Sequence, residues 1–463
     1  MTQGVDGPPS TGPRADFVAL LKLAVPLGLV QLGYQFVSLV DAAFAGRLSE
    51  QALAASGLGS SVFFAISVMG IGIALGIDPL VAQALGAREI RRARHVLWQG
   101  VYAAAISTVP LTLLVIAGVY QLERFGVVPE LAVDTRTYVF ARLPSLFPLL
   151  LAVTLRSYLQ AERLTKPILW ATVWTNVFNA AANYVLIFGD AGLTDLGLPA
   201  VGLPSFGLAG LGWATVVAMS AQAGALARAV WALPEIADGE GLRTFDPKVV
   251  REIFVIGTPI ALHLVAEVGV FAAVQVLMGR MGVLATAAHQ VALMFAAMTF
   301  SFALGVGSAT SVQVGRAIGA GDHQATRRSG LMGVGLGTSV MVLGAVTMWT
   351  APELLARILT PDPEVIALAA TLLRIAGAFQ IVDGVQTVAG GALRGAGVTR
   401  YTFIAHLIAH WVVGLPLGIY LARTQELGAA GLWWGLTAGL TVAAVVLAEK
   451  FLRLSRKPIA RLG

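Results

Sequence analysis

The chain carries long apolar runs separated by short connectors, and this pattern confines it to a fold inside a lipid bilayer. A helix that crosses a bilayer needs roughly 20 consecutive apolar residues. Of the 463 residues, 57% are hydrophobic and 12% are charged, whereas a soluble domain carries about 25% charged residues. We therefore predict an all-α integral membrane protein with twelve transmembrane helices. The predicted spans are residues 17–44, 53–77, 96–120, 138–160, 167–189, 207–233, 253–278, 284–312, 329–350, 365–392, 401–423 and 427–452.

Basic residues gather in alternate connectors. Of the 31 Lys and Arg residues, 21 fall on one side of the predicted membrane, 6 on the other side and 4 within spans. In this count Arg156, Arg423 and Lys450, which lie toward the ends of their spans, are assigned to the adjoining connectors. The richer side of a membrane protein faces the cytoplasm. We expect a multi-pass protein of the cytoplasmic, or inner, membrane with both termini cytoplasmic. This distribution also explains the net charge of +6 without a nucleic-acid partner.

The two halves of the chain repeat at an offset of 233 residues. Pro26 falls on Pro259 at this offset, and the Gly46-Arg47 pair falls on Gly279-Arg280. Because six spans is an even number, both halves keep one orientation, which makes a parallel repeat. The junction is expected at Gly239–Asp246. We predict a disordered cytoplasmic tail at 1–16, a six-helix bundle at 17–233, a cytoplasmic connector at 234–252, a second bundle at 253–452 and a tail at 453–463.

Apart from Glu449 near the end of the last span, three carboxylates lie within the predicted spans, where an ionisable group is costly and usually functional. Asp41 shares a helix face with Tyr34 or Gln35, and Glu267 follows His263 by four residues. Asp383 has Gln380 and Gln386 three residues to either side and Thr387 four residues further on. These spacings place each pair on one side of a helix. We interpret Asp41, Glu267 and Asp383 as ion-coupling residues. Asp41 could instead end its helix at the interface, and the two others could be neutral packing groups.

Amides and imidazoles are the other polar groups inside the spans. Asn176, Asn179 and Asn183 line one face of the fifth span, either toward a cavity or as contacts between helices. His406 and His410 have the spacing of a metal pair, but no carboxylate accompanies them on their helix, so packing or cavity lining is the better interpretation. The chain has no cysteine, which excludes thiolate chemistry.

Four functional classes fit a membrane protein of this size. A flippase for lipid-linked oligosaccharides should have a strongly cationic cavity, whereas the deep charges here are acidic. An enzyme would need a nucleophile with a base or a metal site, and a channel would not need carboxylates in both halves. No Walker motif is present to use ATP. An ion-driven secondary transporter, with no enzyme activity and no cofactor, fits best.

Four motifs lie at separate places along the chain: Val40-Asp41, Ala45-Gly46-Arg47, Gly305-Val306-Gly307-Ser308-Ala309-Thr310 and Asp383-Gly384-Val385-Gln386. Together they resemble the multidrug and toxic compound extrusion family, and the resemblance covers residues 17–452. The resemblance implies two six-helix bundles in a V, whose central cavity opens alternately to either side. It also implies export of drugs or toxic organic cations in exchange for H+ or Na+, by a chain that we expect to act as a monomer.

The acidic residues of the seventh and tenth spans are similar to those of the NorM-like branch of that family. The resemblance implies a cation site, possible for Na+, near Glu267 and Asp383, and a polar cluster of Asp41 with Asn179 and Asn183. Some members carry a tyrosine one turn before the tenth-span aspartate, where this chain has Phe379. The missing oxygen makes Na+ less favoured. Cavity-lining residues are then expected at Tyr34, Gln35, Asn176, Asn179, Asn183, Phe379 and Gln380.

Overall fold

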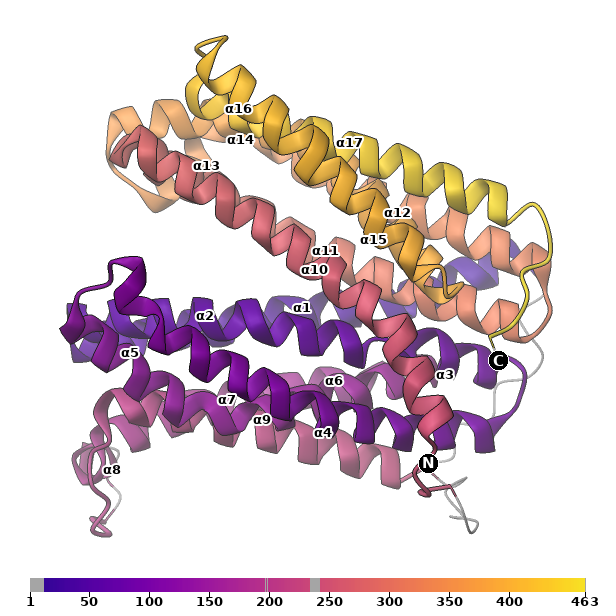
Figure 1. The fold of residues 1–463 in the computed structure, drawn as a ribbon, viewed down its shortest axis with the longest axis horizontal. Helices are drawn as coiled ribbons and strands as arrows, with labels where there is room; N and C mark the ends of the chain where they lie inside the picture. Colours follow the sequence, from indigo (N-terminus) through magenta and orange to yellow (C-terminus); the bar gives the residue numbers. More distant parts are fainter. Residues whose placement is uncertain (1–11, 196, 198, 234–241, 463) are drawn as a thin grey trace. The chain divides into compact units, whose positions relative to one another are not determined.

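The computed structural model describes residues 12–195, 197, 199–233 and 242–462, and all regular structure in this part of the chain is helical (Figure 1). The predicted all-α class is therefore confirmed. Every predicted span coincides with a helix or with consecutive helices. The long helices are α1 (Pro13–Leu48), α2 (Glu50–Ala74), α4 (Ile90–Tyr120), α5 (Pro129–Arg142), α6 (Leu146–Ala161), α7 (Thr165–Phe188), α9 (Gly207–Trp231), α10 (Pro247–Met281), α11 (Val283–Gly319), α12 (His323–Thr350), α14 (Pro363–Gly395) and α17 (Gly428–Leu454). The shorter elements are α3 (Ile77–Gly86), η1 (Leu122–Phe125), η2 (Leu143–Ser145), α8 (Asp190–Asp195), α13 (Pro352–Leu359), α15 (Thr399–Leu407), η3 (Ile408–Gly414) and α16 (Leu415–Arg423).

Eleven helical stretches of the described chain are long and apolar enough to cross a membrane. The fifth predicted span, 167–189, is the exception and corresponds to α7, which has 24 residues. Its three asparagines and several threonines lower the mean hydropathy of the helix. A polar helix of this kind is stable in a bilayer only where its polar face is covered by protein or water.

Local sequence signals set the helix boundaries. Ser49 caps α2 by accepting a hydrogen bond from the Ala52 amide at 3.0 Å, and Asp322 caps α12 through the Ala325 amide at 2.8 Å. Asp362 caps α14, where Pro363 occupies the first turn. Helix α1 begins at Pro13, so the last residues of the predicted tail 1–16 are helical, while residues 1–11 lie outside the described chain.

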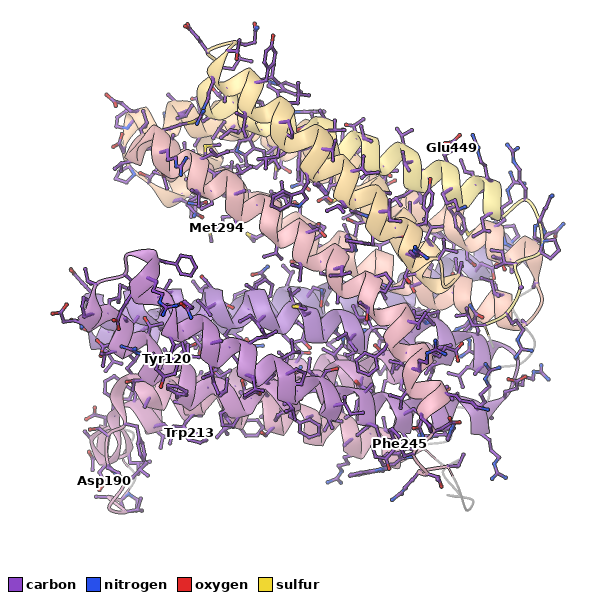
Figure 2. All side chains as sticks on the ribbon, in the orientation of Figure 1. Tyr120, Asp190, Trp213, Phe245, Met294 and Glu449 are labelled. Atoms are coloured by element: carbon purple, nitrogen blue, oxygen red, sulfur yellow. The ribbon has the colours of Figure 1, made fainter. Side chains whose placement is uncertain are left out.

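The helices group into two compact units. Unit 2 consists of the described parts of Val30–Val81 and Glu89–Val268. In it, α9 packs against α5, α6 and α7, while α2 packs against α4 and α5. Asp190 and Phe245 lie at opposite ends of this unit (Figure 2). Near Phe245, the Gln99 side chain of α4 donates to the Thr244 carbonyl at 2.8 Å and accepts from the Asp246 amide at 2.9 Å. These bonds attach the described end of the predicted junction to α4. Residues 239–241 of the junction lie outside the described chain.

Unit 1 consists of the described parts of Met1–Leu29, Ala82–Arg88 and Gly269–Gly463. Helix α14 lies at its centre and packs against α11, α12 and α17. The predicted span 401–423 is interrupted by η3, a π-helical segment between α15 and α16. Gly414 in η3 approaches Gly435 and Gly439 of α17 closely, because none of these residues has a side chain to separate the helices. The predicted bundle boundaries remain predictions.

Candidate functional site

Asp41 is the centre of a polar cluster in unit 2. Asp41 is 9% exposed, and its Oδ1 accepts hydrogen bonds from the side-chain amides of Asn183 at 2.7 Å and Asn179 at 3.1 Å. The Asn183 amide also donates to Asn179 Oδ1 at 3.2 Å. Helices α1 and α7 thus meet at one carboxylate. The structure brings together the three residues that the resemblance implied for this cluster.

Arg142 is the cation whose charge acts on Asp41. Its guanidinium lies over the Phe63 ring, 4.7 Å from the centroid, and donates to Ser60 at 2.9 Å and to Tyr138 at 2.5 Å. These contacts fix the arginine in place through a ring and two hydroxyls. Burial disfavours the ionised form of Asp41, and the positive charge of Arg142 opposes part of that effect.

A second arginine reaches the predicted polar face of α1. Arg156 of α6 lies over the Tyr34 ring at 5.6 Å, and its Nη1 lies 3.4 Å from the Tyr34 hydroxyl and 3.5 Å from Gln31 Oε1. Gln222 of α9 also donates to the Tyr34 hydroxyl, at 3.1 Å. From the sequence we assigned Arg156 to a connector. This assignment is wrong, because Arg156 lies inside α6 and contacts Tyr34 and Gln31 of α1.

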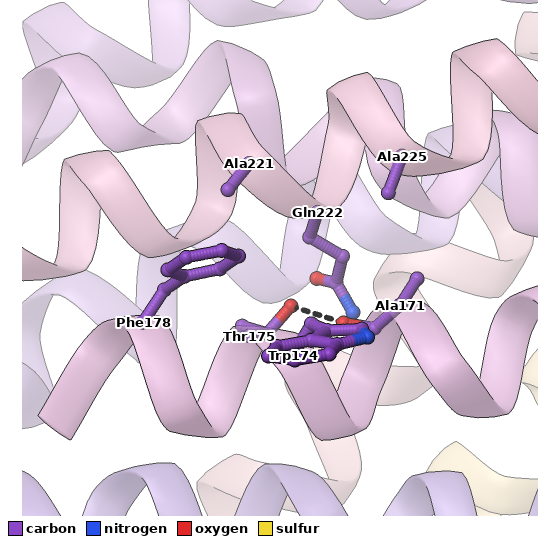
Figure 3. Close-up of a pocket in the computed structure, with 7 residues that line it drawn as sticks. All are labelled: Ala171, Trp174, Thr175, Phe178, Ala221, Gln222 and Ala225. Carbon is purple, nitrogen blue, oxygen red and sulfur yellow. Dashed lines mark hydrogen bonds between the residues drawn. The ribbon is translucent and has the colours of Figure 1, made fainter. Parts of the chain in front are cut away.

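A small cavity lies between α7 and α9 (Figure 3). Its volume is about 280 Å³, and it is lined by Trp174, Phe178, Gln222 and smaller side chains. The Gln222 Oε1 is buried and has no hydrogen-bond partner among the described residues. Pockets that enclose drug-sized molecules measure roughly 300–1,000 Å³. We therefore do not assign the drug site to this cavity alone.

Glu267 lies on α10, in unit 2. Its Oε2 is 3.3 Å from His263 Nε2, and both side chains are 17% exposed. The contact predicted from the four-residue spacing is present. Asp383 belongs to unit 1, whereas Glu267 belongs to unit 2. A sodium site formed by both carboxylates therefore stays a prediction.

Asp383 begins a buried chain of hydrogen bonds in unit 1. The Thr387 hydroxyl lies 3.2 Å from Asp383 Oδ1 and 3.0 Å from Gln386 Oε1. The Gln386 amide contacts His406 Nε2, and His406 Nδ1 lies 2.7 Å from the Thr402 carbonyl oxygen. Asp383, Gln386 and His406 are at most 4% exposed. The spacing in the sequence predicted that Thr387 and Gln386 lie near Asp383 on one helix. No sequence signal predicted that His406 of another helix contacts Gln386.

Two other predicted residues flank Asp383. Phe379 packs in the apolar core of unit 1, where its ring meets Phe271 at 6.3 Å and Trp433 at 5.7 Å, edge to face. Gln380 is fully buried and donates to the Ala296 carbonyl at 3.2 Å, while its Oε1 has no partner among the described residues. This oxygen lies on the same helix face as Asp383. Phe379 acts here as a core residue, and Gln380 supplies a buried acceptor.

Two of the expected cavity residues remain outside these clusters. Gln35 is exposed, whereas Tyr34, its alternative on the helix face, bonds Gln222. Asn176 donates to the Thr172 carbonyl of its own helix at 2.9 Å. The clusters also contain Arg142, Arg156 and Gln222, which our sequence analysis did not single out. Long-range partners of this kind have no local sequence pattern, although charged residues within a span were a signal for the arginines.

These features define a polytopic membrane protein with buried, hydrogen-bonded carboxylates in both units. The MatE family matches residues 26–185 and 259–420, and the two matched segments begin at the two prolines of the sequence repeat. The chain is 36% identical to the probable multidrug resistance protein NorM of Bradyrhizobium diazoefficiens, over 98% of this chain and 97% of that protein. It is 35% identical to the multidrug resistance protein NorM of Burkholderia vietnamiensis, over 97% and 96%. The chain therefore belongs to the MatE family of transporters, and is not an enzyme.

Solved structures show the same fold. A eukaryotic MATE transporter, AtDTX14, superimposes with a TM-score of 0.83 at 20% identity, covering 96% of this chain and 98% of that one. A multidrug resistance MATE family transporter, described in an outward-facing conformation, superimposes with a TM-score of 0.84 at 19% identity, covering 97% and 99%. The all-helical, two-lobed membrane fold implied by the resemblance is confirmed.

Proposed function

We propose that this chain exports organic, often cationic, compounds from the cytoplasm in exchange for protons, alone or alongside sodium. Relatives at about 35% identity over nearly the whole chain carry the name multidrug resistance protein. In this proposal the chain acts as a monomer in the cytoplasmic membrane, with both termini in the cytoplasm. The arginine asymmetry of the connectors supports that orientation.

The observation that carries the proposal is a buried carboxylate in each compact unit. Asp41 is held by amides from α7, and Asp383 by the hydroxyl of Thr387. Burial penalises a charged carboxylate, and a bound proton or cation removes that penalty. An ion that binds one conformation more tightly than another shifts the protein toward it. Each carboxylate is thus a place where ion binding can drive alternating access.

Protons are favoured over sodium alone because a proton needs a single carboxylate, whereas hard cations prefer a shell of several oxygen ligands. Thr387 offers one hydroxyl oxygen beside Asp383, and the ring of Phe379, one turn before Asp383, offers none. Phe379→Tyr would add a hydroxyl one turn from Asp383. If sodium coupling is limited by this missing oxygen, the substitution should increase sodium-driven export.

The test is export of ethidium, a fluorescent organic cation, by the full chain in reconstituted vesicles. Proton and sodium gradients are imposed separately. We expect export with a proton gradient, and at least a tenfold lower initial rate for Asp41→Asn, Glu267→Gln and Asp383→Asn, because each change removes an ionisable group and keeps its shape. Glu130→Gln, at an exposed position, is the matched control and should keep the wild-type rate.

Two results would contradict the proposal. Near-normal export by all three neutralised variants at equal protein amounts would remove the carboxylates from the mechanism. Export driven by a sodium gradient alone, undiminished when the proton gradient is collapsed, would overturn the preference for protons.

A further inference from the structure

Another cavity of the described chain lies in unit 1, where the end of α12, the short helix α13 and α14 meet. Its volume is about 420 Å³, and its lining includes Trp349 of α12, Glu353 and Arg357 of α13, and Arg374 of α14. The described lining of the cavity between α7 and α9 has no charged residue. The cavity in unit 1 has two positive charges and one negative charge, so it attracts anions.

The level of Arg374 along α14 follows from its contact with Trp349. The Trp349 indole donates to the Arg374 carbonyl oxygen at 2.8 Å. Gly377, one turn further along α14, has no side chain to displace the indole. Trp349 lies at the end of α12, and tryptophan is enriched where the membrane meets water. Arg374 therefore lies beside the end of a spanning helix, from where its long side chain can reach the lipid head groups.

The two arginines of the cavity have no partner within the chain. In the part of the chain that the structure describes, neither the Arg357 nor the Arg374 guanidinium makes a hydrogen bond or an ion pair. Glu353 precedes Arg357 by four residues, the spacing of an ion pair within a helix, yet these described side chains do not form one. In the sequence repeat Arg357 corresponds to Arg124, which does donate to Gln121, at 2.9 Å. Like charges at one cavity repel each other, and a bound anion would remove that repulsion.

The flank of the cavity on α13 is apolar. Leu354 lines the cavity and Ile358 lies one turn further on, and both side chains are exposed, whereas Pro352 and Ala356 form the buried face of the helix. A helix with apolar side chains beside a basic residue suits the membrane interface. A free inorganic anion would gain nothing from Leu354 and Ile358. A phospholipid would offer its phosphate to the arginines and an acyl chain to these two side chains.

We propose that this cavity binds the phosphate of an anionic phospholipid, with Arg357 and Arg374 as donors and Leu354 and Ile358 against an acyl chain. A guanidinium can donate two parallel hydrogen bonds to one phosphate. Basic pockets between transmembrane helices bind anionic head groups. The lining contains none of the carboxylates assigned to ion coupling. The lipid site therefore goes beyond the proposed export and does not depend on the coupling ion.

The test measures the affinity of phosphatidylglycerol for the purified full chain in detergent. The probe is a phosphatidylglycerol with a fluorescent acyl chain, and fluorescence anisotropy reports its binding. We expect Arg357→Gln and Arg374→Gln each to weaken binding about fivefold, and added salt to weaken binding to the wild type. Glu353→Gln removes the negative charge of the cavity and should tighten binding, which loss of folding cannot imitate.

Arg423→Gln is the matched control, because Arg423 is an exposed arginine of the same unit that does not line the cavity. It should bind the probe like the wild type. Unlabelled phosphatidylglycerol should displace the probe, whereas phosphatidylcholine and inorganic phosphate at the same concentration should displace much less.

Three results would overturn the lipid site. The first is unchanged binding in both cavity variants, or an equal loss in Arg423→Gln. The second is displacement by inorganic phosphate as effective as that by phosphatidylglycerol, which would show a site for free anions. The third is equal displacement by phosphatidylcholine, which would show that the negative charge of the lipid is not recognised.

Discussion

The two buried aspartates differ in where their partners come from. Asp41 on α1 receives amide hydrogens from α7, 138 and 142 residues away in the sequence. Asp383 on α14 accepts a hydrogen bond from the hydroxyl of Thr387, one turn along its own helix, and Gln386 of the same helix contacts His406 of α15. The described partners of Asp41 therefore come from another helix, whereas Thr387 lies on the same helix as Asp383.

The two aspartates also differ in the charged groups near them. Asp41 has Arg142 as a cationic neighbour, and Arg142 is itself fixed by Phe63 and Tyr138. Along its chain Asp383 has an imidazole, which becomes a cation only when it takes a proton. Burial disfavours the ionised form of a carboxylate, and a positive charge nearby offsets part of that cost. The Asp41 cluster offers a permanent positive charge for this, whereas the Asp383 chain offers a titratable group.

The largest expected effect on stability is at Asp41. Asn183→Ala removes the shorter of the two amide donors, and a hydrogen bond to a charged group contributes about 1.5–3 kcal/mol. We expect a clear fall in the thermal midpoint of the protein in detergent. Asn179→Ala, at the longer distance, should cause a smaller fall, and Thr387→Val in unit 1 the smallest. A fall for Thr387→Val as large as that for Asn183→Ala would remove the contrast between the two sites.

Helix packing should respond similarly in both units. A side chain at Gly72 of α2 would overlap the Ala261 backbone of α10, and one at Gly391 of α14 would overlap the Gly307 backbone of α11. Overpacking costs about 1–3 kcal/mol, so Gly72→Ala and Gly391→Ala should both lower the thermal midpoint. Gly57 and Gly335 have open space around an added Cβ, and their alanine variants are the controls. A lower thermal midpoint in only one of these two variants would show that the two units differ in helix packing as well as in polar contacts.

The smallest effect is expected outside the membrane, at Asp190. Its carboxylate accepts hydrogen bonds from the backbone amides of Val201 and Leu203 at 3.0 Å and Gly202 at 2.9 Å. These bonds lower the pKa of Asp190 below its ordinary value of 3.8. The stability that these hydrogen bonds give to the folded state is fully present above pH 3.8 and is lost as the pH falls through the lowered pKa of Asp190.

Hydrogen exchange can measure this contribution locally. Asp190→Asn should reduce the protection of the amides at 201–203 at neutral pH and leave the helix interiors unchanged. Protection in the wild type should be constant from pH 7 to pH 4 once intrinsic exchange is accounted for. A decrease already at pH 5 would contradict the lowered pKa.

The sequence alone determined the membrane setting, the repeat and the three deep carboxylates. Hydropathy and charge act through the bilayer, which admits only helices with satisfied backbones and leaves basic residues on one side. These constraints are local to each span, so they can be read without knowing which helices touch. The spacing within one helix likewise placed Asp383 with Gln380 and Thr387, and Glu267 with His263.

Tertiary structure decided which polar groups meet across helices. No spacing along the chain joins Arg156 to Tyr34, Arg142 to the Asp41 cluster, or His406 to Gln386, because these contacts depend on how helix faces are turned toward one another. The structure also adds the π-helical segment η3, whose Gly414 lies close to Gly435 and Gly439 of α17. It adds the ring contacts of Phe379 with Phe271 and Trp433, while the cavity role of Phe379 stays a prediction.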